Sequence, residues 1–250
     1  MKKPLIAVCY RGQKLVKLAN ILQQMGYRTE CRPDPVDLSM LAGKRIPDLL
    51  IFDQESYAAL ADQLSQRGVQ MPVIVAGTPD TIPAKYNPHD YLSQPDDVDS
   101  IHDLLTRHLA SFSRQHLRIA VRLPGIYSLD GQDELCDIHS LGTGGVFLQT
   151  QSLRLGRDHQ LQLVIPLLGM KRELEITGQV IYQVLPSAEN NYNQGIGIQF
   201  TDACPADIKM LRDYIYFALL NGHHGIAEVH SFDEQLKPKM PTMGMALRFS

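Results

Sequence analysis

The sequence has little cysteine and no long hydrophobic run. Four cysteines lie far apart with no CxxC pair, which excludes a zinc knuckle and a thioredoxin-type redox pair: Cys9, Cys31, Cys136 and Cys204. We expect buried, reduced thiols, as in a cytoplasmic protein. No segment approaches the ~20 apolar residues of a transmembrane helix. The apolar run at residues 5–9 is too short for a signal peptide. We therefore predict a cytoplasmic localisation and no membrane span.

Neither sign of charge dominates, and no catalytic pattern stands out. The 24 Lys and Arg residues against 27 Asp and Glu residues give a net charge of −3, which argues against a protein that coats DNA or RNA. We find no Ser/His/Asp or Cys/His set, no glycine-rich phosphate loop and no catalytic carboxylate pair. His223, His224 and His230 have no partner at metal-ligand spacing. We therefore expect no enzyme, no metal site and no cofactor.

The first half of the chain has the pattern of an α/β domain. With 250 residues, 44% of them hydrophobic and 20% charged, the chain is long and apolar enough for two globular domains. Short apolar runs alternate with helical periodicity, which is typical of a parallel sheet built from βαβ units. We expect strands at residues 5–10, 27–32, 49–52, 72–76 and 91–92, and helices at 15–25, 56–67 and 96–110.

Two segments of this half resemble the receiver domain of response regulators. They are residues 47–53, Pro-Asp-Leu-Leu-Ile-Phe-Asp, and residues 91–95, Tyr-Leu-Ser-Gln-Pro. The resemblance implies a doubly wound, flavodoxin-like fold with Asp53 as the candidate phosphoacceptor. Receivers also use an acidic pair to hold Mg²⁺ and a lysine before the last proline, where this chain has Arg11 and Gln94. We therefore predict a pseudo-receiver, in which Asp53 is an acid at a strand end that is solvated or caps a turn.

The second half has the pattern of an antiparallel β-domain. Alternating or glycine-bounded apolar segments predict strands at residues 117–123, 145–148, 161–165, 174–177, 178–184 and 195–200. Helical periodicity follows at about residues 205–220. Six strands and one helix indicate a small antiparallel β-barrel with a C-terminal helix packed against it.

Arg114 and Arg118 form an RxxxR pattern at the start of this half, and residues 140–145, Ser-Leu-Gly-Thr-Gly-Gly, follow it along the chain. The RxxxR pattern resembles the entry of a PilZ domain, the barrel that binds cyclic di-GMP, and residues 140–145 lie where the (D/N)xSxxG motif of that family is expected. The resemblance implies that the two arginines clamp the phosphates and guanine bases of the ligand. It assigns the rest of the site to Ser140, Gly142 and Gly145, with Ser140 in place of the acid or amide and Gly142 in place of the serine.

A second alignment of the motif remains open. An insertion of two residues restores Asp137 as the acid, with Asp137 and Ile138 ahead of the displaced Ser140. This alignment requires the register of the hairpin to shift. If the acid is lost instead, one charged hydrogen bond to a base is missing, which weakens binding by roughly ten- to hundredfold without abolishing it.

We predict a receiver-like domain at residues 1–111, a PilZ-like barrel at 112–222 and a tail at 223–250. The predicted function is a non-catalytic cytoplasmic signalling protein that binds cyclic di-GMP through Arg114 and Arg118 and relays binding by reorienting its domains or contacting a partner. The alternative is a ligand-free adaptor that uses both degenerate domains for protein-protein interaction. The protein partner is unidentified, and a homodimer remains open.

Overall fold

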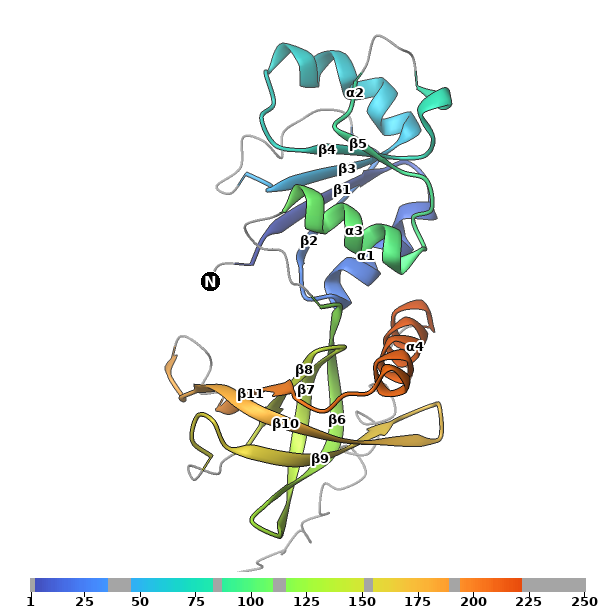
Figure 1. Ribbon diagram of the computed structural model, residues 1–250. Coiled ribbons are helices and arrows are strands. Elements are labelled where there is room, and N and C mark those ends of the chain that lie inside the picture. Colours follow the sequence, from blue (N-terminus) through green and yellow to red (C-terminus); the bar gives the residue numbers. More distant parts are fainter. Residues whose placement is uncertain are drawn as a thin grey trace, which may run out of the picture.

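The computed structural model of the chain describes residues 3–35, 46–82, 87–109, 116–150, 155–188 and 194–221 (Figure 1). Arg114 and the tail at residues 223–250 lie outside these residues.

The N-terminal part of the chain is a five-stranded parallel sheet. Its strands are β1 (Leu5–Tyr10), β2 (Arg28–Pro33), β3 (Leu49–Asp53), β4 (Val73–Ala76) and β5 (Asp90–Leu92), in the order β2-β1-β3-β4-β5. The helices are α1 (Lys14–Gln24), α2 (Gln54–Gln66) and α3 (Val98–His108), and the short 3₁₀ helix η2 (Pro79–Thr81) follows β4. The five strands and the three α-helices lie within a few residues of the predicted segments. The buried strands β1, β3 and β4 were predictable because strands covered on both faces leave continuous apolar runs in the sequence. The sheet is that of an α/β domain.

The helices cover both faces of this sheet (Figure 1). Ile6, Ile51 and Ile74 face the side on which α1 and α3 pack, whereas Phe52 and Val75 face the side covered by α2. All five side chains are at most 1% exposed. Because successive strand residues point to opposite faces, each strand supplies both layers.

The C-terminal part is a closed antiparallel barrel followed by one helix. The strands are β6 (Arg118–Leu129), β7 (Gln132–Gly142), β8 (Gly145–Gln149), β9 (Gln160–Leu167), β10 (Arg172–Val184) and β11 (Gly195–Phe200), closed in the order β10-β11-β8-β7-β6-β9. The helix α4 (Pro205–Asn221) follows. The predicted barrel and C-terminal helix are therefore confirmed.

Two of the strand predictions were wrong, although the number of strands agrees. The segments 174–177 and 178–184 form one continuous strand, β10. Gly178 does not end the strand, because glycine is used there to make room for the side chain of Ile198 on β11. The strand β7 was not predicted at all. Its first four residues, 132–135, are exposed and mostly polar, and a bulge further along interrupts its alternation.

The helix α4 joins the barrel to the α/β part. The buried side chains on the α1–α3 face, in the barrel and on α4 form one connected hydrophobic cluster, and α4 contacts α1. Burial raises the pKa of the Tyr216 hydroxyl on α4, and the neighbouring carboxylate of Asp99 on α3 raises it further. Among the described residues, no helix is long and apolar enough to cross a membrane.

The expectation of four buried thiols is met by only two of them. All four cysteines are free, with Cys9 and Cys136 buried but Cys31 and Cys204 exposed. Burial raises the pKa of both buried thiols to about 12, so they stay protonated and unreactive at neutral pH.

Candidate functional site

Asp53 lies in an open hollow at the carboxyl ends of the parallel strands. The hollow has a volume of about 480 Å³ and is lined by residues that follow β1, β3, β4 and β5. One carboxylate oxygen of Asp53 accepts a hydrogen bond from the backbone N–H of Arg11 at 2.5 Å, and the other accepts one from the backbone N–H of Ser56 at 2.7 Å. Asp53 is the N-cap of α2, so its carboxylate stabilises the start of this helix.

The surroundings of Asp53 supply little of what phosphoryl transfer needs. The only other carboxylate among the residues lining the hollow is Glu55. In the described part of the chain, no three His, Cys, Asp or Glu residues come together in a way that could hold a metal ion. The side chain of Gln54 fills the space beside Gly77, another residue that lines the hollow. Among the described residues that line the hollow, Arg11 is the only cation, and no lysine is present.

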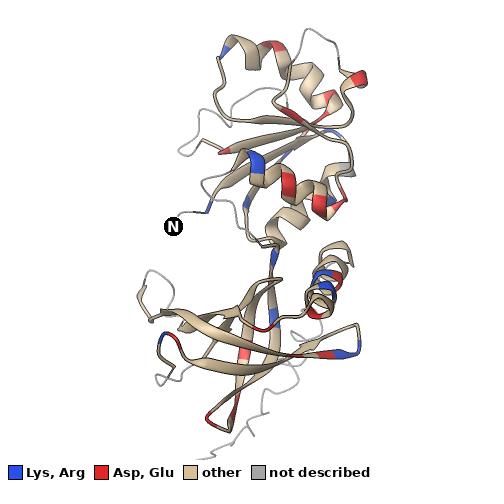
Figure 2. Ribbon diagram, in the orientation of Figure 1, with Lys and Arg blue, Asp and Glu red and all other residues tan. Residues whose placement is uncertain are grey.

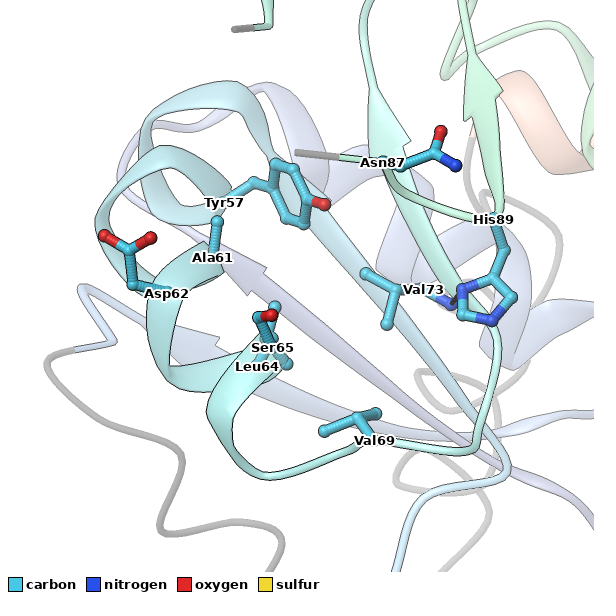
Figure 3. A pocket seen from close by; sticks show the side chains of 9 residues that line it. All are labelled: Tyr57, Ala61, Asp62, Leu64, Ser65, Val69, Val73, Asn87 and His89. Atoms are coloured by element: carbon cyan, nitrogen blue, oxygen red, sulfur yellow. Dashed lines mark hydrogen bonds between the residues drawn. The ribbon is translucent and has the colours of Figure 1, made fainter. Parts of the chain in front are cut away.

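A smaller hollow of about 330 Å³ lies beside α2 (Figure 3). Its polar residues are Asp62, Ser65, Asn87 and His89. The Nδ1 atom of His89 accepts a hydrogen bond from the backbone N–H of Val73 at 3.1 Å. The imidazole therefore holds the loop before β5 against the start of β4, which is a structural role.

Arg118 is the first residue of β6, close to the α/β part. Figure 2 shows basic residues on this strand near its start. Arg118 is half-buried and pairs with Gly142 on β7, while Ala120 pairs with Ser140. Within the described part of the chain, the Arg118 guanidinium makes no hydrogen bond or ion pair. Arg118, Ser140 and Gly142 thus lie close together, where the start of β6 pairs with the end of β7.

A β-bulge separates Asp137 from Ser140 on β7. Against β8, Ile138 pairs with Leu148 but Ser140 pairs with Phe147, so His139 is an extra residue. Ile138 and Leu141 are buried in the barrel, whereas Asp137 is exposed and Ser140 is half-buried. Residues at i and i+2 share a face of a regular strand. The bulge extends this spacing by one, so Asp137 and Ser140 are successive outward residues. The second alignment assumes an insertion of two residues, whereas the bulge on β7 adds one.

The predicted glycines are required by the barrel itself. A Cβ atom at Gly142 would lie 2.9 Å from the carbonyl oxygen of Leu117, closer than packing allows. At Gly145 it would overlap the carbonyl oxygen of Ile198 on β11. Gly144, between them, is covered by the ring of His116, which a Cβ would meet at 2.5 Å. These glycines let β8 and the β7–β8 turn approach their neighbours closely.

An aromatic pair on the outside of the barrel was not predicted from the sequence. The rings of Phe147 on β8 and Tyr182 on β10 are nearly parallel, with their centroids 6.3 Å apart and an interplanar angle of 20°. Between their strands runs β11, whose Gly195 and Gly197 lie beneath the two rings. The signal was the Gly-x-Gly at the start of β11, since glycine within a strand often marks close approach by another group.

Comparison with known proteins identifies the barrel. Residues 112–217 match the family model of the PilZ domain, so this part of the chain is a PilZ domain, as the sequence predicted. No match is found among curated proteins.

Three similar solved structures cover less than half of this chain each. The first is the inhibitor of motility MotI/DgrA from Bacillus subtilis, with 17% identity, a TM-score of 0.39 and coverage of 44% of this chain and 53% of that chain. The second is the PilZ domain of YcgR from Escherichia coli with c-di-GMP, with 15% identity, a TM-score of 0.36 and coverage of 49% of this chain and 98% of that chain. The third is the MrkH–c-di-GMP complex of K. pneumonia, with 20% identity, a TM-score of 0.39 and coverage of 45% of this chain and 54% of that chain. The chain spans about half the length of the first and the third.

Proposed function

We propose that this protein is a non-catalytic signalling protein whose PilZ domain binds cyclic di-GMP through the RxxxR segment, Arg114 and Arg118. The observation that carries the proposal is the position of Arg118: it pairs with Gly142 at the end of β7, and its guanidinium makes no hydrogen bond or ion pair with the described residues. A guanidinium is suited to phosphate oxygens and to guanine edges, and it stacks on base planes. The match of residues 112–217 to the PilZ domain supports this ligand.

Asp137 is proposed as the acid of the second motif, with Ser140 as its serine. The bulge at His139 supports this assignment, because it directs Asp137 and Ser140 to the same side of β7. A serine at position 142 would press its Cβ on the carbonyl oxygen of Leu117, which disfavours the first alignment. A carboxylate at Asp137 can accept hydrogen bonds from the Watson–Crick edge of a guanine.

Calorimetric titration of the full chain with cyclic di-GMP tests the function and the alignment together. We expect the unsubstituted protein to bind, and Asp137→Ala to weaken binding by roughly ten- to hundredfold, since one charged hydrogen bond to a base is lost. Asp137→Asn keeps an acceptor and should stay within severalfold, and Glu175→Ala, an exposed acid of β10, controls for charge.

Two results would contradict these assignments. No binding by the unsubstituted protein at high micromolar ligand would reject the proposed function and favour the ligand-free adaptor. If Ser140→Ala abolishes binding and Asp137→Ala leaves it unchanged, the first alignment is favoured, in which Ser140 stands in place of the acid.

The N-terminal part is proposed to be a pseudo-receiver, with a domain boundary near residue 111. The strand order β2-β1-β3-β4-β5 supports a doubly wound, flavodoxin-like fold. Asp53 already caps α2 and accepts a hydrogen bond from Arg11, and it lacks the partners that neutralise a phosphoryl group. This domain therefore provides contacts and does no phosphoryl chemistry.

Incubation with a small phosphodonor and Mg²⁺, followed by intact-mass measurement, tests this role of Asp53. We expect no phosphoryl adduct on the unsubstituted chain, because charge neutralisation at the transferring oxygens is missing. Asp53→Asn is the matched control, since it preserves the size of the side chain. A stoichiometric adduct that disappears in Asp53→Asn would identify a working receiver.

The relay is proposed to run through the junction between the two domains. The arginine segment lies between the end of α3 at His108 and the start of β6 at Arg118. The helix α4 of the barrel also touches the α/β part, where Tyr216 lies beside Asp99. A ligand that draws the arginine segment onto the barrel changes the geometry of this junction, which is a hinge-type mechanism. The output is contact with a protein partner.

A further inference from the structure

We propose that Phe147 and Tyr182 form a stacking surface for one purine base of the ligand, an inference that rests on the proposed function. It starts from the pairing of the strands. Ser140 of β7 pairs with Phe147 of β8, Phe147 pairs with Gly197 of β11, and Gly197 pairs with Tyr182 of β10. These four residues therefore form one lateral row across the outside of the barrel.

The two glycines of β11 explain why the rings lie against the sheet. Outward side chains at positions 195 and 197 would lift the rings away, since a Cβ at Gly195 would meet the ring of Phe147 at 2.6 Å and one at Gly197 would overlap the ring of Tyr182. With glycine at both positions, the rings rest on the backbone of β11. Tyr182 stays 41% exposed and Phe147 is half-buried. Each ring therefore keeps part of its surface open to solvent.

The surface lies within reach of the residues assigned to the ligand. Neighbouring strands are about 4.8 Å apart, so Phe147 is one strand away from Ser140 and two strands away from Arg118. A cyclic dinucleotide held at its phosphates by Arg118 thus extends a base over the outer face of β8 and β11. This is the only arrangement in the described part of the chain that offers nearly parallel aromatic rings on the barrel surface.

The chemistry of the surface fits a purine and does not distinguish between purines. Every base has a flat π-face, and a base that stacks on an aromatic side chain gains affinity regardless of its edge groups. Selection of guanine must then come from groups that read base edges, such as Arg118 and Asp137. The aromatic pair adds affinity, and the charged residues add specificity.

The simplest competing explanation is that the rings only cover the glycines of β11. Aromatic side chains often stabilise strand glycines in this way. The two explanations differ in what they require at position 182. A cover needs only an apolar side chain, whereas a stacking surface needs a ring.

Titration of Tyr182→Leu and Tyr182→Phe with cyclic di-GMP distinguishes them. If a base stacks on the pair, Tyr182→Leu should lose about tenfold to a hundredfold in affinity and Tyr182→Phe should stay within about twofold. Ile181→Ala, the neighbouring exposed apolar residue of β10, is the control and should bind normally. Cyclic di-AMP serves as a second probe, and Tyr182→Leu should weaken its residual binding by the same factor.

If Tyr182→Leu fails to fold, nuclear magnetic resonance of the unsubstituted protein can still test whether a purine stacks on the two rings. A stacked purine shifts the ring protons of Phe147 and Tyr182 upfield, so we expect these shifts to move in proportion to ligand occupancy. Unchanged ring shifts at saturation, or equal affinities of Tyr182→Leu and the unsubstituted protein, would overturn the stacking surface and leave the proposed function intact. Absence of any binding by the unsubstituted protein would instead overturn the proposed function.

Discussion

Replacing Arg118 with alanine is expected to lower the affinity for cyclic di-GMP below detection at micromolar protein. Truncating one partner of a charge-assisted pair typically costs about 2–5 kcal/mol, which is roughly thirtyfold to several thousandfold in affinity. The fold should be retained, because Arg118 lies at the very start of β6 and its side chain is not part of the buried cluster.

The matched control is Arg172→Ala. Arg172 is an exposed arginine at the start of β10. Its replacement by alanine removes the same charge as Arg118→Ala, but at a position away from the β6–β7 junction. It should bind as the unsubstituted protein does. If both variants bind equally well, the arginine clamp is wrong and any binding arises elsewhere.

The same proteins test the relay. Small-angle scattering with and without ligand should give different scattering curves for the unsubstituted protein if its domains reorient. The Arg118→Ala variant should give one curve under both conditions. Ligand binding without any change in scattering would restrict the mechanism to partner contacts on the barrel surface.

Replacing Gly145 with alanine is expected to destabilise the protein by about 2–3 kcal/mol, an overpacking effect. Its Cβ would overlap the carbonyl oxygen of Ile198, and it would come within 3.4 Å of the Cα of Gln199. Both contacts are with the backbone of β11, so neither can be relieved by rotating a side chain. Urea unfolding should therefore give a lower midpoint with little change in slope.

Gly12→Ala provides the control for this substitution. A Cβ at Gly12 meets nothing within 4 Å, so its stability should stay within about 0.5 kcal/mol of the unsubstituted protein. If Gly145→Ala unfolds like the unsubstituted protein but no longer binds cyclic di-GMP, then Gly145 contacts the ligand and its packing role is secondary.

The first half of the fold was accessible from sequence because its signals are local. Strands such as β1 and β3 are buried on both faces, so they appear as unbroken apolar runs, and α1 and α3 keep one apolar stripe each. The departures from the receiver pattern, Arg11 and Gln94, are also visible without any coordinates. The cap that Asp53 forms on α2 agrees with the expectation of an acid that caps a turn.

The site on the barrel was only partly accessible. Arg114, Arg118 and the glycines could be proposed as ligand-binding residues from the sequence, because a motif with fixed spacing can be recognised along the chain. The proposal of Asp137 rather than Ser140 as the acid could not be made from the sequence, because it depends on which residues face outward, and a single bulge changes this for the rest of the strand. The partnership of Phe147 and Tyr182 joins strands that are 35 residues apart in sequence and separated in space by β11.

The sequence by itself therefore determined the α/β pattern of the first half, the PilZ assignment of the second half and the departures from the receiver pattern at Arg11 and Gln94, since periodicity and residue type decide these. Only the tertiary structure decided the register of β7, the need for glycine at positions 142 and 145, and the row that runs from Ser140 to Tyr182. The physical reason is that each of these depends on how closely the backbones of neighbouring strands approach, and that distance is set by pairing between distant parts of the chain.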